Sequence, residues 1–387
     1  MLSEISEFPK HSGASGDFGA AKASRRFQVS SAFRRFRSLQ TVRSRGDFQN
    51  FQEQASAQPN KRAMNLYEKY FLSGKGIPFF YYVWNVLFGL IPGFILRARR
   101  RRLLSGWEKR QDADYIRRRA ENACLLHEPF ELGENAIPLS DIRPGRIKSR
   151  ACFDLLRTLR YFPQHLRVNV YDGDIHENPK EPTLVKGRRL KEGKENAVLL
   201  NLDRLRICLQ PRDRIPFRDK RDELIFRGYT HGKPERRRFL EQWFGKPGFD
   251  LGDTDAGHPS PWYKPPISIP DHFGYKFVLT LEGNDWSSAL PWVMASGCVP
   301  VMPRPTAEGW HCHSLMKPGV HYIEIASDFS DAGEKIAYYI SHPDEAEKIS
   351  MESKKFVEKF FDRRRELIIS LLVMERYFSM SGQKIEK

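Results

Sequence analysis

The polar loop Glu282-Gly283-Asn284-Asp285 places acidic and amide side chains between two apolar segments. The β-branched and aromatic run Phe277 to Leu281 predicts a strand before it, and the helical spacing of apolar residues from Trp286 to Ser296 predicts a helix after it. In a parallel sheet such a loop lies at the carboxyl end of its strand, and the next helix begins with free backbone N–H groups. An anionic ligand would be stabilised there, with Ser287 and Ser288 as hydroxyl donors. The alternative is that these side chains are ordinary helix N-caps.

A second acidic group, Asp172-Gly173-Asp174, follows the strand-like run Arg167 to Tyr171. Two carboxylates one residue apart can coordinate a hard cation such as Mg²⁺ or Mn²⁺, because such cations prefer oxygen ligands. One carboxylate alone can instead accept a proton from a hydroxyl group. Asp253-Thr254-Asp255 repeats the same spacing, so the triplet by itself does not decide between the two chemistries.

The elements around these residues alternate between helices and strands, which indicates an α/β fold. Helices are expected at Ala113 to Leu126 and within Ile142 to Tyr161. Further strands are expected at Thr183 to Lys186, Ala197 to Leu202, Leu224 to Phe226 and Cys298 to Met302. We predict a disordered basic tail at 1–63, an apolar and basic membrane-proximal region at 64–119, one α/β half at 120–215 and a second at 216–379.

Positive charge is concentrated on both sides of one apolar segment. The chain has 64 Lys and Arg against 48 Asp and Glu, which gives a net charge of +16. Met1 to Met64 contributes +6 of this charge, and Arg97 to Arg119 contributes +7. Between them, Ile77 to Leu96 carries no charge and is just long enough for a membrane-spanning helix. Its two prolines and its early aromatic residues favour peripheral or monotopic attachment to an anionic membrane surface, with a true span and a buried core helix as alternatives.

Several other kinds of site are disfavoured. No helix-turn-helix, zinc-finger or RNA-binding signature accompanies the charge, so nucleic acid is not an expected partner. The five cysteines are scattered and lack CxxC spacing, which argues against a disulfide framework or a structural zinc site. His311-Cys312-His313 offers a metal two imidazoles at most, because consecutive residues of a strand point to opposite faces. No signal peptide is expected at Met1, and Met64 is a plausible second start.

Matching pieces of sequence in a fixed order point to a family. They are YKFVLTLEGND from Tyr275 with the two following serines, the Glu308-x-Trp310 pair, LMKPGVHY from Leu315 to Tyr322 and then DFSDAGEKI, with Phe226-Arg227-Gly228 and Arg236 upstream and Arg376-Tyr377-Phe378 downstream. In these pieces the chain resembles the CAP10-like domain of glycosyltransferase family 90, and especially its bacterial lipopolysaccharide A protein branch. The resemblance covers roughly Tyr115 to Phe378 and departs from the family pattern at Ala289 and His313.

The resemblance implies a GT-B-like fold, with two Rossmann-like halves that face a cleft. It implies an enzyme that moves a sugar from a nucleotide donor, by expectation a UDP-sugar, to a lipopolysaccharide core or related cell-surface glycan. The nucleotide sugar is a co-substrate, and no further cofactor and no metal are expected. The expected location is the cytoplasmic face of the bacterial inner membrane. A metal-dependent D-x-D enzyme and a non-catalytic, membrane-associated glycan-assembly protein are the alternatives.

An aspartate of the first half is implied as general base in a displacement that inverts the anomeric centre. The bacterial glycine–aspartate pattern assigns this role to Asp174, and the eukaryotic asparagine-valine-x-aspartate pattern assigns it to Asp172. We favour Asp174, and the choice between the two stays open in the sequence.

Arg227 with Gly228, and Arg236, are the candidates for the donor phosphates, because a guanidinium offers planar bidentate donors that match phosphate oxygens. Arg227 could instead pair with Asp222 or Glu223, and Arg236 could belong to a solvated helix face. Further residues are expected to line the cleft, or else to be packing and core residues. They are Glu308, Trp310, His321 and Tyr322.

Overall fold

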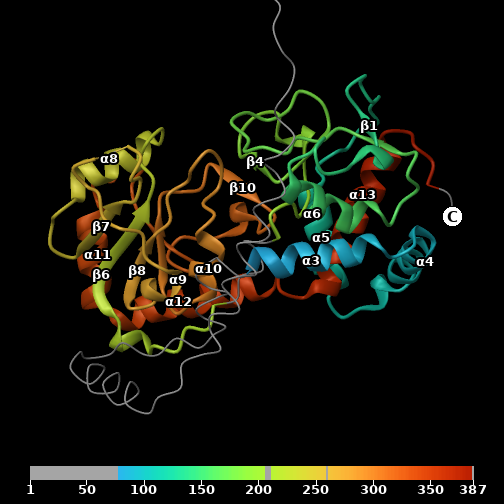
Figure 1. The fold of residues 1–387 in the computed structure, drawn as a ribbon. Helices are drawn as coiled ribbons and strands as arrows, with labels where there is room; N and C mark the ends of the chain where they lie inside the picture. The colour runs from blue at the N-terminus through green and yellow to red at the C-terminus, as the bar shows by residue number, and fades with distance from the viewer. Residues whose placement is uncertain (1–76, 205–210, 259, 386–387) are drawn as a thin grey trace, which may run out of the picture. The chain divides into compact units, whose positions relative to one another are not determined.

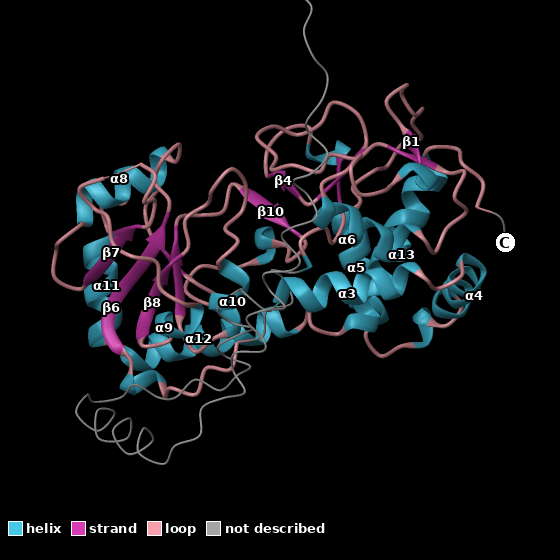
Figure 2. Ribbon diagram, viewed as in Figure 1, coloured by secondary structure: helices cyan, strands magenta, loops and turns pink. Residues whose placement is uncertain are grey.

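The structure, a computed structural model, describes residues 77–204, 211–258 and 260–385, and the structural statements below refer to these residues (Figure 1). They form a mixed α/β fold in which one parallel sheet carries helices on both faces (Figure 2). This confirms the α/β class predicted from the alternation of strands and helices. The predicted tail at 1–63 lies outside the described residues.

Five parallel strands form the main sheet, in the order β11–β9–β8–β6–β7. Their bounds are β6 Arg221–Gly228, β7 Phe249–Asp253, β8 Tyr275–Leu279, β9 Val299–Met302 and β11 Ile323–Glu324. Alternate residues of a strand point to opposite faces, so Leu224 and Phe226 of β6 pack into one apolar cluster and Ile225 packs into another. The sheet is therefore buried on both faces, as parallel strands joined by helices require.

Helices on each face complete these two clusters. On the face of Leu224 lie α8 (Pro234–Trp243) and α11 (Ala332–Ser341), and on the face of Ile225 lie α9 (Ile269–His272) and α10 (Leu290–Ala295). The long helix α12 (Pro343–Glu358) begins in the first of these clusters and ends in the core of the other half of the fold. The strand–loop–helix–strand order predicted for residues 277–302 is confirmed.

One boundary within that order differs from the prediction. The helix expected at Trp286 to Ser296 is the short α10, which begins only at Leu290. Pro291 explains the late start, because a proline fits the first turn of a helix, whereas in the interior it removes a hydrogen bond and clashes with the preceding turn. Ser287 and Ser288 therefore lie in a turn before the helix and do not cap it with their side chains.

The other half of the fold is mainly helical, with short strand pairs. Its helices are α3 Ile77–Gly89, α4 Gly93–Leu104, α5 Ala113–Ala123, α6 Ser149–Leu159 and α13 Arg363–Met380. Strands β1 (Ile137–Pro138) and β2 (Arg167–Val168) pair antiparallel, β3 (Thr183–Val185) and β5 (Ala197–Leu199) pair parallel, and β4 (Gly187–Arg189) pairs antiparallel with β10 (Ala307–Gly309).

Among the described residues this half has a small sheet, and the implied second Rossmann-like half stays a prediction. The parallel part of this sheet consists of β3 and β5, and Val170 adds only a single bridge to Leu184. The strand predicted at Arg167 to Tyr171 is accordingly shorter. Pro182, directly before β3, has no N–H group with which to extend the pairing, and this limits the ladder.

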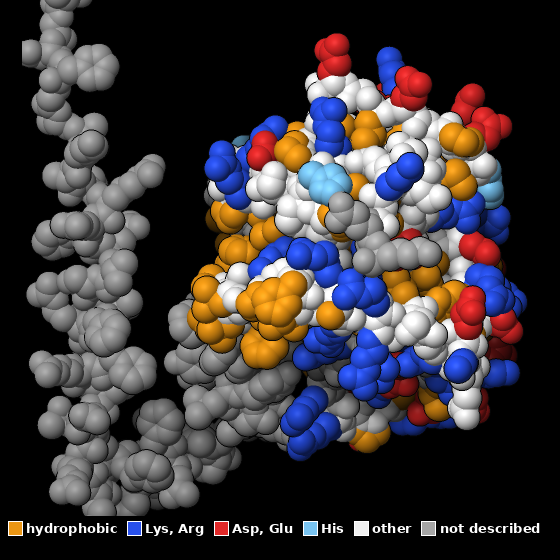
Figure 3. All heavy atoms as spheres, turned by 90° about the vertical axis from the view of Figure 1, so that its right-hand side faces the viewer, with side chains coloured by type: hydrophobic (Ala, Val, Ile, Leu, Met, Phe, Trp, Pro, Cys, Tyr) orange, Lys and Arg blue, Asp and Glu red, His pale blue; other side chains and the backbone are white. Residues whose placement is uncertain are grey.

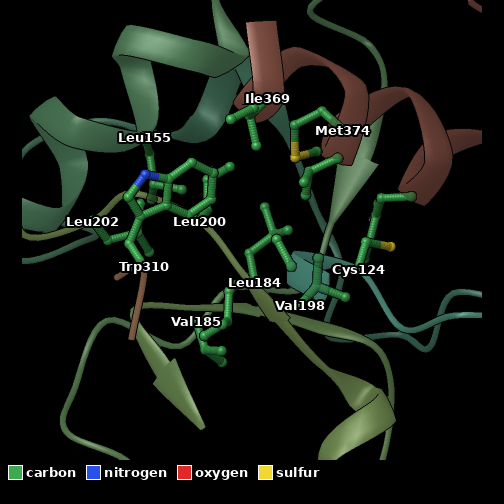
Figure 4. Packing of buried hydrophobic residues seen from close by; sticks show 14 of the residues in the cluster. Cys124, Leu155, Leu184, Val185, Val198, Leu200, Leu202, Trp310, Ile369 and Met374 are labelled. Carbon is green, nitrogen blue, oxygen red and sulfur yellow. The ribbon is translucent and has the colours of Figure 1, made fainter. Parts of the chain in front are cut away.

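The C-terminal helix α13 belongs to the core of the helical half, although the predicted boundary at 216–379 assigns it to the other. It packs against α4, α5 and α6. Ile369 and Met374 of α13 lie in one buried cluster with Leu184 and Trp310 (Figure 4). The chain therefore returns to its first half after it has built the parallel sheet.

The predicted apolar segment forms α3 and α4, which are bent by 99° relative to each other. Among the described residues no single helix is long and apolar enough to cross a membrane, and only this bent pair passes that test together. Trp84, Leu90 and Phe94 are 61%, 74% and 65% exposed, whereas Asn85 and Leu96 are 3% and 1% exposed, so the segment has one apolar side in solvent and one side against the protein.

Candidate functional site

A pocket of about 570 Å³ lies at the carboxyl edge of the parallel sheet. Its walls are the loops that follow β6, β8, β9 and β11, with residues 232–235, 280–284, 302–307 and 327–329, and we call it the sheet-edge pocket. Loops at this edge of an open parallel sheet are where α/β folds bind their ligands. The sequence predicted this position for the loop at 282–285.

The beginning of α8 supplies positive charge to the sheet-edge pocket. Lys233 and Pro234 line it, and the N-terminus of this ten-residue helix has no side-chain cap. Arg238, which pairs with Glu235 at 2.5 Å, and Arg304, which pairs with Glu324 at 3.3 Å, line the same pocket, so Lys233 is its cation that pairs with no carboxylate in the described residues. The N-terminus of α8 therefore lies at this edge of the sheet. The sequence predicted that the N-terminus of the helix after Glu282 to Asp285 would do so, but that helix, α10, has only six residues. An anion would be stabilised at α8 by backbone N–H groups and by cationic side chains.

Arg236 lies behind the loop that closes this pocket. Its guanidinium donates to the backbone oxygens of Tyr229 and Leu281, both at 3.3 Å, and its Nε has no partner among the described residues. No carboxylate lies within ion-pair distance of it in the described residues, and burial lowers the pKa of its guanidinium. Arg236 is thus not the solvated surface arginine of the alternative interpretation. It is a cation whose charge no neighbouring carboxylate neutralises.

Within the loop, Glu282 holds the backbone in place. Its Oε1 accepts hydrogen bonds from the N–H groups of Thr306 at 2.8 Å and Ala307 at 3.1 Å, and its Oε2 accepts one from the Thr306 hydroxyl at 2.6 Å. Gly283 lines the pocket beside it. The Glu282 carboxylate therefore joins two walls of the pocket and has little capacity left for a ligand.

Asn284 connects this loop to a second pocket. Its backbone oxygen accepts a hydrogen bond from Arg189 at 2.6 Å, and its side-chain oxygen accepts one from Lys233. Its Nδ2 donates to Oδ2 of Asp174 at 2.8 Å. The predicted loop and the predicted aspartate, 110 residues apart in the sequence, are therefore in direct contact.

The second pocket has a volume of about 620 Å³ and contains both predicted aspartates, so we call it the aspartate pocket. Asp172 accepts a hydrogen bond from the backbone N–H of Lys148 at 2.7 Å. Asp203, 7% exposed, adds a third carboxylate. His176 and Asn284 line this pocket and the sheet-edge pocket alike, so the two pockets adjoin.

Lys186 organises the carboxylates where the pockets adjoin. Its Nζ lies 2.5 Å from Asp174 and 3.2 Å from Asp285. Burial alone would lower the pKa of Lys186, but the charges of Asp285 and Asp174 outweigh burial and raise it. Burial raises the pKa of Asp285 against the opposing charge of Lys186. Asp285 therefore binds the lysine from within the protein, whereas Asp174, with 40% of its side chain exposed, faces the pocket.

Five of the predicted donor residues do not line the sheet-edge pocket: Arg236 and Asp285, described above, and Arg227, Gly228 and Ser288. Arg227 pairs with Asp250 at 2.7 Å and also donates to the backbone oxygen of Asp250 at 2.8 Å. The predicted alternative partners, Asp222 and Glu223, are not the ones it uses. Gly228 does not line the sheet-edge pocket either. Of the two serines, Ser287 is buried and lines that pocket, and Ser288 is exposed and does not line it.

The four residues expected either to line the cleft or to be packing and core residues have partners within the protein. Glu308 is fully buried and pairs with Arg188, and the Trp310 indole donates to Glu366 at 2.6 Å inside the helical core. Tyr322 is also buried, and its hydroxyl donates to Glu324 at 2.7 Å. His321 accepts a hydrogen bond from the Lys317 backbone at 2.9 Å. None of these four lines either pocket.

The sequence did not single out several residues that do line the pockets. Lys233 was detectable, because Gly-Lys-Pro after a strand indicates the start of a helix at the sheet edge. His313 lines the sheet-edge pocket with only 2% of its surface exposed, and burial lowers its pKa to about 4. Its Nε2 has no partner among the described residues. Trp286, whose ring lies 5.4 Å from that of His313, lines the same pocket.

Metal ligands do not gather in this part of the chain. Among the described residues, no group of three or more His, Cys, Asp or Glu side chains is arranged to hold a metal ion. The ring centroids of His311 and His313 lie 6.3 Å apart, and burial lowers the pKa of both imidazoles. The cysteine between them is a buried free thiol.

Comparison with known proteins identifies similar chains. The family model described as glycosyl transferase family 90 matches residues 204–377. O-glucosyltransferase LpsA of Dichelobacter nodosus is 34% identical over 304 residues, which are 78% of this chain and 95% of that protein. Protein O-glucosyltransferase 2 of Danio rerio is 33% identical over 90 residues, which are 23% of this chain and 18% of that protein. Protein O-glucosyltransferase 3 of Homo sapiens is 23% identical over 116 residues, covering 30% and 23% of the two chains.

Proposed function

Because the chain belongs to glycosyltransferase family 90, we propose that the sheet-edge pocket holds a nucleotide-sugar donor and the aspartate pocket holds the glycan acceptor. Family membership makes the chain a glycosyltransferase, with a sugar donor and a glycan acceptor, and not a non-catalytic assembly protein. We propose a UDP-sugar as donor, with glucose as the sugar because the similar LpsA is named an O-glucosyltransferase. The proposed acceptor is a lipopolysaccharide core or a related cell-surface glycan.

The proposed donor site follows from the charges around the sheet-edge pocket. Breaking the anomeric C–O bond leaves negative charge on the departing diphosphate, and fixed positive groups stabilise that charge as it develops. Lys233, Arg238 and the N-terminus of α8 stand at this pocket, and Arg236 lies behind its loop. The unpaired nitrogen of His313 is available to a hydroxyl of the donor.

The proposed chemistry is a single displacement. The acceptor oxygen attacks the anomeric carbon, the bond from that carbon to the diphosphate oxygen breaks, and the hydroxyl proton passes to a carboxylate of the protein. Attack from the side opposite the leaving group inverts the anomeric centre. The nucleotide diphosphate leaves with the bonding electron pair, so atoms and charge balance without a further cofactor.

Asp174 is the proposed base, and one observation carries this choice: its hydrogen bond to Asn284 holds it where the two pockets adjoin. A general base must reach the acceptor hydroxyl at the point where that hydroxyl meets the donor carbon. Asp172 and Asp174 both line the aspartate pocket, but Asp172 is held by Lys148 and not by Asn284, the loop residue that lines both pockets. Its proposed part is to position the acceptor.

We also propose that the enzyme works at the cytoplasmic face of the bacterial inner membrane, attached peripherally through α3 and α4. The exposed apolar side chains of these helices and the arginines that follow them support the proposal. Tyr82 of α3 lines the aspartate pocket, so the acceptor site adjoins the helix proposed to touch the membrane. A lipid-linked glycan would then reach the pocket from the membrane surface.

The test compares Asp174→Asn with Asp172→Asn in the full-length protein. We expect Asp174→Asn to lower turnover by about 10²- to 10⁴-fold and to leave UDP-sugar affinity unchanged, because the base acts on the acceptor and not on the diphosphate. Asp172→Asn should mainly raise KM for the acceptor. Turnover measured with excess acceptor and donor affinity measured by calorimetry separate the two effects.

The same variants test the metal-dependent D-x-D alternative. If Asp172 and Asp174 hold a cation, EDTA abolishes activity, Mn²⁺ restores it, and both substitutions weaken donor binding. Under the proposed mechanism activity survives EDTA. Full turnover in Asp174→Asn would remove this residue from the base role, whatever the effect of EDTA.

A further inference from the structure

Four arginines converge on a pocket of about 480 Å³ between α4 and the start of α13. Arg99 and Arg102 come from α4, and Arg363 and Arg364 come from α13, with Leu103 as the remaining wall. We call this the arginine pocket. All four arginine side chains are exposed, and neither the catalytic proposal nor the predicted site residues account for them.

The carboxylates around the arginine pocket are already engaged. Glu375 lies 3.8 Å from Arg100, Asp362 lies 3.4 Å from Arg110, and Asp112 lies 3.1 Å from Arg365. Within the described residues none of the four pocket arginines pairs with a carboxylate.

The four guanidinium groups around this small pocket repel one another, and a bound anion would offset that repulsion. Phosphate fits this role, because each guanidinium can donate two parallel hydrogen bonds to its oxygens. The pocket therefore has the charge and the donor geometry of a phosphate site, and its counter-charge must come from a ligand.

The arginine pocket adjoins an exposed apolar surface. Ile95, Arg99 and Arg102 recur at the i, i+4 and i+7 positions of α4, so one face of the helix passes from an exposed apolar side chain to two pocket arginines. Phe94, 65% exposed, and Leu90, 74% exposed, extend the apolar surface toward α3. Figure 3 faces the side of the molecule on which α4 lies and shows hydrophobic side chains gathered beside Lys and Arg side chains.

Helix α3 presents its apolar side outward, the reverse of an ordinary surface helix. Asn85 is only 3% exposed and accepts a hydrogen bond from Arg157 at 2.7 Å, and the Tyr81 hydroxyl donates to Asp154 at 2.8 Å. Trp84 and Leu87 on the outer side are 61% and 52% exposed. A helix that binds the protein through polar groups and exposes apolar ones matches a lipid interface, where the apolar face enters the acyl boundary.

We propose that the arginine pocket binds the phosphate of an anionic lipid headgroup while the apolar side chains of α3 and α4 enter the same leaflet. The inference rests on the proposed membrane attachment and assigns it a specific headgroup site. The lipid is the source of the phosphate because pocket and apolar surface are continuous along one face of α4. A soluble phosphate would leave that surface in water.

The test uses full-length protein and vesicles of phosphatidylcholine with or without phosphatidylglycerol. Arg99→Gln with Arg102→Gln removes two pocket charges and retains side chains that can hydrogen-bond. At roughly fivefold per arginine, partitioning onto phosphatidylglycerol vesicles should fall about 25-fold. The matched control, Lys348→Gln with Lys354→Gln, removes two exposed charges of α12 and should change partitioning little. Equal losses in both variants, or no loss in the arginine variant, would overturn the headgroup site.

Two further measurements distinguish a lipid from a free phosphate, and a wrong headgroup site from a wrong membrane attachment. In the first, inorganic phosphate is added to the wild type and to the arginine variant. If phosphate raises the melting temperature of the wild type alone, and both proteins bind vesicles equally, the pocket binds a free anion and the lipid proposal is overturned. Trp84→Ser with Leu87→Ser tests the attachment itself and should reduce binding to both kinds of vesicle. Wild-type protein that ignores all vesicles would overturn the attachment and the headgroup site together. Binding that depends on the apolar pair but not on the arginines would overturn the headgroup site alone.

Discussion

The sequence makes both Arg227 and Arg236 candidates for binding the donor phosphates, but the two side chains have different surroundings in the structure. Arg227 shares Asp250 with Lys264 and Tyr275. Burial raises the pKa of Asp250, but the hydrogen bonds from these three side chains outweigh burial and hold the pKa well below its usual range. The charge of Arg227 is thus neutralised within the sheet. In the described part of the chain Arg236 donates to two backbone oxygens and pairs with no carboxylate, and we propose that its charge acts on a donor phosphate.

We therefore expect Arg236→Ala to weaken UDP binding by about 2–4 kcal/mol and Arg236→Lys to recover only part of the loss, because an ammonium cannot reproduce a bidentate fork. Arg227→Ala should instead lower the free energy of unfolding by about 1–3 kcal/mol and change UDP affinity little, because half-buried Asp250 loses one of its three side-chain partners and keeps Lys264 and Tyr275. Calorimetry and denaturant unfolding on the three proteins measure both quantities. A larger affinity loss for Arg227→Ala would return the phosphate role to Arg227.

His311 and His313 are buried imidazoles, and His313 lines the sheet-edge pocket. His313 has a folded pKa of about 4, lowered by burial, against an ordinary value of 6.5. The unfolded chain therefore binds a proton at a higher pH than the folded chain does. Below pH 6.5 that proton favours unfolding, so stability falls as pH decreases from 6.5 toward 4 and does not depend on this histidine above pH 7.

For His313 alone the loss between pH 6.5 and 4 is on the order of 3 kcal/mol in the free energy of unfolding. His313→Gln should make the pH dependence in this range shallower by about 1.4 kcal/mol per pH unit. Urea unfolding at four pH values measures the slope, with His165→Gln at an exposed position as the control. An unchanged slope in His313→Gln would contradict the buried neutral state.

At the scale of elements, the pairing of β4 with β10 joins the helical half to the loops of the sheet-edge pocket. Arg188 and Glu308 are Cα partners in this pair and form a fully buried ion pair. Gly187 is paired with Gly309, and the indole of Trp286 packs against both glycines. The two glycines leave room for the Trp286 ring, which in turn forms a wall of the pocket.

Gly309→Ala should destabilise the protein by about 1–3 kcal/mol, because it overpacks this junction. The new Cβ would lie 2.6 Å from Nε1 of Trp286 and force the indole to move. Gly106→Ala is the matched control, since its Cβ would meet only a backbone oxygen at 3.9 Å. Thermal unfolding followed by tryptophan fluorescence reports both stability and the position of the ring. Equal melting temperatures for the two variants would show that the junction is loosely packed.

The apolar segment is both a structural and a surface element. Leu96 of α4 is 1% exposed in the helical core, whereas Phe94 beside it is 65% exposed. A deletion that removes α4 would therefore unfold part of the core and would not isolate membrane binding. Substitutions on the exposed face leave the core side of the helix intact, which is why the membrane test relies on them.

At the scale of the whole molecule, the proposed function depends on two pockets whose residues come from different parts of the chain. Apart from His176 and Arg189, the residues that line the sheet-edge pocket lie within the region that matches the family model, at 204–377, whereas Asp172 and Asp174 precede that region. Asn284 and Lys186 connect the two, through Asp174 and Asp285. The proposed donor and acceptor sites can then adjoin although their residues are far apart in the sequence.

Local patterns in the sequence determined the parallel sheet, the loop at its carboxyl edge and the two aspartates, because strand and helix periodicity and turn residues act over a few neighbouring positions. Only the tertiary structure decided which polar groups meet. Arg227 pairs with Asp250 because β6 and β7 are neighbours in register, and Trp310 is a core residue because α13 returns to the helical half and brings Glu366 to it. These partners lie tens of residues away in the chain. Whether a charge is neutralised or a side chain is buried therefore depends on strand order and helix packing, which no local pattern encodes.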